Sequence, residues 1–300
     1  KSTFKPTSRD YDMKGLENYL VTISDFNVQA QIGKGGYGEV FYGIHIKTGR
    51  KVAIKKLILS RLDGSDLVYF NREVQILASC ENYFLLPLIG YSNSYPYIIV
   101  TDFVPCGSLF EALRHKPGSP LLTDTMKTKI GLGIAIGMIA LHDKNIIHRD
   151  LKSLNILISQ ETLPRICDFG IARFTDTGKD PSCPQTFFTA NIGTPHWMAP
   201  EILQSGRYTD KVDQFSYAVI LWEMLTESLP FQGMKELYQV ALKIISGERN
   251  PIPLNAPIGL RNLIHKLWSQ DPELRPDFRE VYQSFASHEV YFGNTNPDEI

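Results

Sequence analysis

A His, an Arg, an Asp, a Lys and an Asn crowd into one short stretch, residues 148–155 (HRDLKSLN). A core strand or an amphipathic helix needs no such set. If the stretch faces the terminal phosphate of a nucleotide, Asp150 can accept or orient a substrate hydroxyl, Lys152 can neutralise phosphoryl charge, and Asn155 can offer a hard oxygen to Mg²⁺. The pattern therefore indicates phosphoryl transfer, which depends on positioned charge more than on covalent chemistry.

A magnesium site needs a further oxygen ligand, and residues 166–170 (ICDFG) supply the carboxylate of Asp168. Taken alone, an Asp in a polar loop is usually a turn or capping residue. The order of the two motifs along the chain favours metal binding over that alternative.

Residues 32–40 (IGKGGYGEV) hold Gly33, Gly35 and Gly38 in G-x-G-x-x-G order. Dinucleotide-binding folds use the same spacing where a loop opens a helix. Here residues 40–46 alternate with period two, so the loop is predicted to lie between two strands. Glycines let such a backbone lie close over phosphates. A tight hairpin without a ligand is the alternative for this loop alone.

Residues 52–56 (VAIKK) place Lys55 on the next predicted strand, with Val52 and Ile54 on its opposite face. An inward lysine needs an acidic partner, because a desolvated unpaired ammonium costs several kcal/mol. Glu73, in a predicted helix, is the candidate partner. The alternative is an exposed lysine and a solvated glutamate.

The chain has 300 residues, 43% of them hydrophobic and 21% charged, which suits one large domain or two lobes. Its 31 basic and 32 acidic residues nearly cancel, so no overall field favours nucleic acid or an anionic membrane. The four cysteines form no C-x-x-C pair, which favours reduced thiols and a cytoplasmic setting.

No membrane span is expected, because the longest apolar run, residues 130–141, is far shorter than the ~20 residues a bilayer crossing needs. The chain opens on Lys1 and shows no signal segment, so we expect it to be a piece of a longer protein.

The order of predicted elements indicates an α+β fold of two lobes. Antiparallel strands are predicted at 26–32, 39–46, 51–57, 85–92 and 96–103, with one helix at 67–79. Helices are then predicted at 123–142, 210–226, 235–245, 260–268 and 278–288. A ligand site is expected between the lobes.

The predicted boundaries divide the chain into an extension or linker, a first lobe, a hinge, a second lobe and a tail. They run over residues 1–24, 25–103, 102–107, 107–290 and 291–300. Within the tail, residues 293–300 (GNTNPDEI) are expected to be disordered.

Between about residues 25 and 288, the motifs GKGGYGEV, VAIK, HRDLKSLN, DFG and MAPE resemble those of the eukaryotic protein kinases. The resemblance implies a protein kinase domain at 25–290 with the bilobal kinase fold: a small antiparallel sheet with one regulatory helix, then a larger helical lobe. It also implies transfer of the γ-phosphoryl group of ATP to protein hydroxyls, with Mg²⁺ or, as a substitute, Mn²⁺.

By this resemblance, Asp150 is the catalytic aspartate, assisted by Lys152, while Asn155 and Asp168 hold magnesium. Lys55, paired with Glu73, holds the α and β phosphates. The implied nucleotide site consists of Ile32, Gly33, Lys34, Gly35, Gly36, Tyr37, Gly38, Val40, Ala53, Lys55, Thr101, Asp102, Val104 and Leu157. Ala53 and Leu157 would sandwich the adenine, and Thr101 resembles the gatekeeper.

The resemblance also implies structural roles. Glu201 matches an acidic residue that pairs with Arg275. His148 is expected to be structural rather than a general base, within an apolar column that matches Leu77, Leu88, His148 and Phe169 above Asp213.

At Lys152 and Thr194 the sequence resembles that of serine/threonine kinases. At Trp197 and residues 220–225 (ILWEML) it resembles that of the tyrosine-kinase-like group. Serine/threonine specificity in that group is the resulting hypothesis, with dual specificity left open. The alternative is a pseudokinase or scaffold that binds nucleotide without efficient transfer. It is disfavoured because every residue of the catalytic set is present.

Arg149 resembles the arginine that binds a phosphorylated activation loop. That loop holds Thr175, Thr177, Ser182, Thr186 and Thr189. Phosphorylation of Thr186 or Thr189, by an upstream kinase or by the enzyme itself, is expected to order it. Cys167 is expected to face the nucleotide, so that ATP slows its alkylation, and Cys80 is expected in the core.

Overall fold

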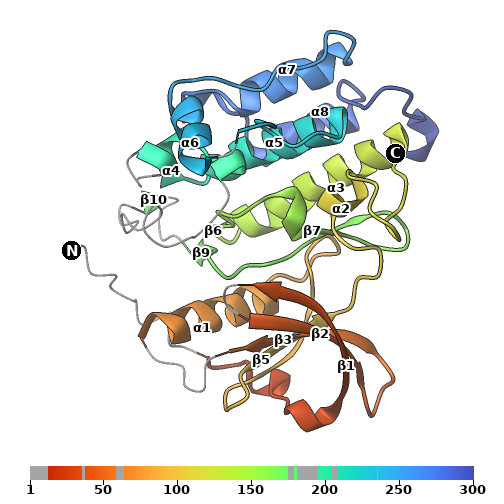
Figure 1. The fold of residues 1–300 in the computed structure, drawn as a ribbon, viewed down its shortest axis with the longest axis vertical. Coiled ribbons are helices and arrows are strands. Elements are labelled where there is room, and N and C mark those ends of the chain that lie inside the picture. The colour runs from red at the N-terminus through yellow and green to blue at the C-terminus, as the bar shows by residue number, and fades with distance from the viewer. Residues whose placement is uncertain are drawn as a thin grey trace.

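The protein is described here by a computed structural model that covers residues 13–35, 38–58, 64–174, 179–180, 195–204, 208–234 and 236–300. The predictions for Gly36, Tyr37, Thr194 and the activation-loop hydroxyls concern residues outside these ranges. Figure 1 shows a sheet with helix α1 at one end of the molecule and a mostly helical part at the other. The α+β two-lobe prediction is confirmed.

The first part is a five-stranded antiparallel sheet in the order β1-β2-β3-β5-β4. Its strands are β1 (Phe26–Gly35), β2 (Gly38–His45), β3 (Lys51–Leu57), β4 (Leu88–Ser92) and β5 (Ile98–Asp102). Val52 and Ile54 are fully buried in a small core on one face of β3. Because side chains alternate along a strand, Lys55 lies on the other face, opposite Val40 and Ile99.

Helix α1 (Gly64–Ser79) covers that second face and begins three residues before the predicted start. Phe70, Val74, Ile76 and Leu77 of this helix belong to the main hydrophobic core, as does Cys80. The prediction of a core position for Cys80 is therefore confirmed. With this face of the helix buried, Glu73 is brought against the sheet.

The second part is mostly helical. Five of its helices confirm predicted positions to within a few residues: α3 (Asp124–His142), α5 (Lys211–Thr226), α6 (Leu237–Ile245), α7 (Ile258–Leu267) and α8 (Phe278–Ala286). Two shorter helices, α2 (Leu109–Ala112) and α4 (Pro200–Gln204), were not predicted. Thr123 caps α3 by accepting from the Met126 amide, and Asp277 caps α8. In the described parts of the chain, no helix is long and apolar enough to cross a bilayer.

Short strands frame the segments that carry the sequence motifs. β6 (Ile146–Ile147) pairs with β9 (Arg173–Phe174), and β7 (Ile156–Ile158) pairs with β8 (Pro164–Ile166). β10 (Lys179–Asp180) pairs with β11 (Tyr208–Thr209). Residues 148–155 therefore run between β6 and β7, and the Asp168 motif directly follows β8.

The prediction of disorder for residues 293–300 is wrong, because this tail is bonded to the start of α3. The Asn294 amide donates to Asp124 Oδ2 at 2.8 Å, and the Asn296 amide donates to Thr125 Oγ1 at 2.9 Å. Polar composition favours disorder only when the polar groups find no fixed partner. Here the side chains of Asp124 and Thr125 at the start of α3 supply those partners.

Candidate active site

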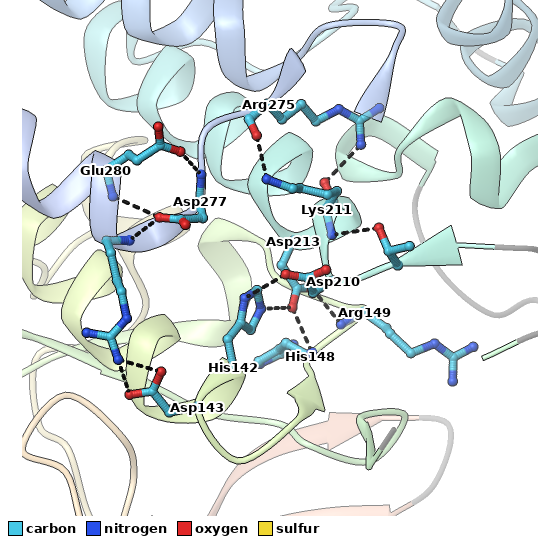
Figure 2. Close-up of polar contacts among 12 residues, drawn as sticks. His142, Asp143, His148, Arg149, Asp210, Lys211, Asp213, Arg275, Asp277 and Glu280 are labelled. Atoms are coloured by element: carbon cyan, nitrogen blue, oxygen red, sulfur yellow. Dashed lines mark hydrogen bonds and ion pairs between the residues drawn. The ribbon is translucent and has the colours of Figure 1, made fainter. Parts of the chain in front are cut away.

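The segment of residues 148–155 is anchored by Asp213, a fully buried residue in the first turn of α5. Its carboxylate accepts from the backbone amides of His148 and Arg149 and from His142 Nε2, each at 2.9 Å (Figure 2). Burial alone would raise the pKa of Asp213, but hydrogen bonding and charge from His142 and His148 lower it. The carboxylate therefore stays ionised and fixes the backbone just before Asp150.

Two predicted site residues, Lys152 and Asn155, contact a third, Asp150. Lys152 Nζ lies 2.7 Å from Asp150 Oδ2. Asn155 Nδ2 donates to the Asp150 carbonyl at 2.8 Å and to Asp150 Oδ2 at 3.0 Å. The carboxylate is thus turned in a defined direction by a cation and an amide, which is the preorganisation that a reacting group needs.

A second cluster joins the sheet, α1 and the Asp168 motif. Lys55 Nζ lies 2.7 and 2.8 Å from the two Glu73 carboxylate oxygens and 3.6 Å from Asp168 Oδ1. Burial alone would lower the pKa of Lys55, but the nearby carboxylates of Glu73 and Asp168 outweigh it and raise that pKa. The predicted pairing of Lys55 with Glu73 is present in the structure.

The Asp168 carboxylate is also held ionised. Burial would raise its pKa, but the charges of Lys55 and Lys152 together lower it. With Asn155 Nδ2 turned toward Asp150, the amide oxygen is the atom that Asn155 can offer to a cation. Among the described residues, no group of three or more His, Cys, Asp or Glu side chains could hold a metal. One carboxylate and one amide oxygen nevertheless fit Mg²⁺, which takes few protein ligands beside phosphate.

Gly33, Gly35 and Gly38 of the glycine loop lie at the adjoining ends of β1 and β2, so the prediction that the loop lies between two strands is confirmed. Gly33 lies opposite Val40, and Gly35 opposite Gly38. A Cβ atom at Gly38 would lie 2.5 Å from the Lys56 carbonyl oxygen, so glycine is required there. Lys34 pairs with Glu39 at 3.4 Å at the surface, and Ile32 is exposed.

The remaining predicted nucleotide contacts lie around β3 and β5 and on β7. Ala53 is directly opposite Thr101, and Leu157 forms a bridge with Ser108. Asp102 binds Arg50 through both carboxylate oxygens, at 2.6 and 2.7 Å, which the sequence reading missed. Because both carboxylate oxygens of Asp102 bind Arg50, we expect Asp102 to contact a nucleotide through its backbone amide or carbonyl. Val104 follows on the linking segment and is half-buried.

Two members of the predicted apolar column, His148 and Phe169, are in direct contact. The rings of His148 and Phe169 lie 5.2 Å apart, and His148 Nε2 lies 3.2 Å from the Cys167 carbonyl oxygen. His148 is fully buried, while Leu77 and Leu88 belong to the same core. This environment fits a structural role for His148.

The predicted pairing of Glu201 with Arg275 is also present. Arg275 Nη1 and Nη2 contact the Glu201 carboxylate oxygens at 2.6 and 3.0 Å. Arg275 is nearly fully buried and also donates to the carbonyls of Ser269 and Lys211. The pair therefore ties α4 to the start of α5 and to the segment between α7 and α8.

A buried polar cluster of Glu223, Trp197 and Arg114 was missed by the sequence reading. Glu223 lies near the end of α5 and accepts from Trp197 Nε1 at 2.7 Å and from Arg114 Nη2 at 2.9 Å. Burial raises its pKa to about 7 despite these partners. The only signal was one charged letter inside the apolar run ILWEML.

Cys167 directly precedes Asp168, and its thiol donates to the Asn155 carbonyl at 3.3 Å. Burial, with the charge of Asp168, raises the pKa of this thiol. Since the thiolate is the reactive species, Cys167 is poorly activated for alkylation. Its protection by ATP stays a prediction.

Comparison with known proteins agrees with this geometry. Residues 26–285 match the family described as the protein kinase domain. The chain is 33% identical over 280 residues to the serine/threonine-protein kinase STY17 of Arabidopsis thaliana, covering 93% of this chain and 47% of that protein. It is 38% identical over 268 residues to a probable serine/threonine-protein kinase of Dictyostelium discoideum, covering 87% of this chain and 19% of that protein.

A third relative, the serine/threonine-protein kinase STY46 of Arabidopsis thaliana, is 34% identical over 271 residues, which is 90% of this chain and 45% of that protein. The chain thus spans less than half the length of these curated relatives. The family match, the two-lobe fold and the similarity to serine/threonine kinases agree with one another, and the chain belongs to the protein kinase domain family.

Proposed function

We propose that this chain transfers the γ-phosphoryl group of ATP to serine and threonine hydroxyls of protein substrates. One observation carries the proposal: Lys55 contacts both Glu73 and Asp168, at 2.7 and 3.6 Å. A single cation thus links the sheet and α1 to the carboxylate predicted to hold magnesium, so the two lobes present their charged groups to one place. Such an arrangement suits a bound triphosphate and its metal.

Each residue of the site then has a defined task. Asp150, aligned by Lys152 and Asn155, orients the substrate hydroxyl and accepts its proton. Lys152 offers positive charge to the transferred group. Lys55 binds the α and β phosphates, and Glu73 keeps that ammonium group in place.

Asn155 and Asp168 are the residues that would hold magnesium, with Mn²⁺ as a substitute. The bound ion would neutralise phosphate charge and so lower the barrier to transfer. Without it, the lowered pKa of Asp168 leaves a full negative charge facing Lys55.

Serine/threonine specificity is supported by the contact between Lys152 and Asp150 and by the similarity to serine/threonine-protein kinases. We also propose that Arg149 binds a phosphate on the activation loop. Arg149 Nη1 donates to the Ile171 carbonyl, close after the Asp168 motif, and its guanidinium lies 5.1 Å from the Tyr208 ring. Mass spectrometry of active enzyme should find phosphate between residues 168 and 201, on Thr186 or Thr189; an unmodified segment contradicts this.

A cytoplasmic location for this domain is proposed from its need for ATP and its reduced thiols. Its partners are then ATP, protein substrates and any activating kinase.

The deciding experiment measures radiolabelled phosphate transfer from Mg-ATP to a basic protein and to the enzyme itself, with phosphoamino-acid analysis. Asp150→Asn is the matched control, because it keeps the side-chain size and removes the charge. Label on Ser and Thr that disappears in this variant supports the proposal. Nucleotide binding without transfer, in every phosphorylation state, would identify a pseudokinase or scaffold.

A further inference from the structure

The segment before the family match, residues 13–25, is bonded to the outer strand of the sheet. Leu20 forms a parallel bridge with Tyr91 of β4, and the Val21 amide donates to the Tyr91 carbonyl at 3.0 Å. Since β4 is the last strand in the sheet order, this segment covers its free edge.

The fit between this segment and β4 is close. A Cβ atom at Gly90 would lie 2.6 Å from Val21 Cγ1 and 2.9 Å from the Tyr19 carbonyl oxygen. Val21 also packs against the small core that contains Val52 and Ile54, while Tyr19 and Met13 pack against the main hydrophobic core. The segment therefore spans both hydrophobic cores that hold the sheet and α1.

The segment is connected to α1 by one direct contact and by one indirect contact through Tyr91 of β4. Gln75 Nε2 lies 4.0 Å from Met13 Sδ. Tyr91, which the segment covers through its backbone, has its ring 6.3 Å from the Phe70 ring. Phe70 and Gln75 flank Glu73 along α1, so both contacts act on the part of the helix that carries the partner of Lys55.

We infer that Met13, Val21 and Tyr91 are positioning residues: residues 13–25 brace α1 where Glu73 reaches Lys55, an inference that rests on the proposed kinase function for its consequence. The physical reason is that a helix of this length is held in place by packing rather than by its own propensity. Removing the brace loosens α1, weakens the Lys55–Glu73 pair and lowers affinity for nucleotide. The extension then sets the activity of the domain.

Hydrogen exchange tests the brace without reference to activity. Gly90→Ala pushes Val21 and Tyr19 away, and Val21→Pro removes the amide that donates to Tyr91. Asn18→Ala, at an exposed position of the same segment, is the matched control. We expect both disruptive variants to speed exchange in residues 13–25 and also in α1 by about tenfold or more, because local opening becomes more frequent. Asn18→Ala should leave both unchanged.

The consequence for the site is tested by the Kd of Mg-ATP in wild-type and Glu73→Gln backgrounds. Val21→Pro should weaken binding about three- to tenfold in the wild-type background and less than about twofold beside Glu73→Gln, because coupled sites are not additive. A purely structural role would lower the Tm in both backgrounds without this difference. In addition, Gly90→Ala combined with Val21→Ala should recover part of the affinity that Gly90→Ala loses.

Several results overturn the inference. They are faster exchange in residues 13–25 with α1 unchanged, no faster exchange in residues 13–25 for either variant, and equal weakening of Mg-ATP binding in both backgrounds. A wild-type chain that transfers no phosphate would sink the proposed function instead, and the exchange result would still decide whether the brace exists.

Discussion

Two buried ion pairs of similar geometry differ in what surrounds them. Lys55–Glu73 joins a strand to α1 at 2.7 Å, and its lysine keeps 23% of its side chain exposed. Arg275–Glu201 joins segments of the helical part at 2.6 Å, and its arginine side chain is 0% exposed and also binds two backbone carbonyls. In the first pair, the lysine also faces a third charge, that of Asp168. In the second pair, the other hydrogen bonds of the arginine go to the backbone. Similar distances therefore serve chemistry in one region and architecture in the other.

The largest expected effect is the loss of activity in Lys55→Met. We expect kcat/KM for peptide phosphorylation to fall about 10²- to 10³-fold, because a preorganised charge at the phosphates is lost. The Tm should fall less than in Arg275→Ala, because methionine fills the volume of the lysine stem and Glu73, whose pKa is raised by burial, can take up a proton. Steady-state kinetics and a thermal melt measure both quantities. A large drop in Tm with modest loss of activity would contradict the division of roles.

Arg275→Ala should show the opposite pattern. Removing the arginine takes a buried cation away from Glu201 and from two carbonyls, so the free energy of unfolding should fall by about 3–5 kcal/mol. Urea unfolding followed by fluorescence measures it, with Lys211→Met as the control for loss of a neighbouring cation. Near-normal stability with lost activity would place this pair with Lys55–Glu73 instead.

Glu223 sharpens the comparison, because it is a fully buried acid whose negative charge the surrounding residues only partly stabilise. Its pKa rises from 4.5 to about 7, so between these values the folded protein keeps a proton that the unfolded chain releases. Wild type should therefore lose stability with rising pH relative to Glu223→Gln, by up to about 3 kcal/mol between pH 4.5 and 7. Urea unfolding of both proteins at several pH values tests the slope, and parallel curves would refute it.

The smallest effect is expected at Arg279 and Asp143, which lie 2.7 Å apart with 66% and 49% of their side chains exposed. Arg279→Ala should change the free energy of unfolding by about 0–1 kcal/mol, because water screens an exposed pair. The difference should shrink further in high salt. A loss as large as that of Arg275→Ala would show that burial is not what separates the pairs.

Much of the fold was predictable, because regular patterns decide it locally. The strand around Lys55 follows from alternation, and α3 follows from helical spacing behind the Thr123 cap. The two-residue strands β6 and β9 were not predictable, because pairs so short form only where distant segments meet. The prediction of disorder for the tail failed for the same reason, because the partners of Asn294 and Asn296 lie at the start of α3, far away in the sequence.

The sequence by itself determined which residues could do chemistry: the set at 148–155, the carboxylate of Asp168, the glycine loop and the lysine of β3. Side-chain type and spacing suffice for this, since only certain groups bind phosphate or magnesium. The tertiary structure alone decided which charges meet. Lys55 reaches both Glu73 and Asp168, Asp102 turns to Arg50, and Glu223 is buried beside Trp197 and Arg114. Such pairings depend on how lobes and helices pack, because the energy of a charge is set by its neighbours and its burial rather than by its position in the chain.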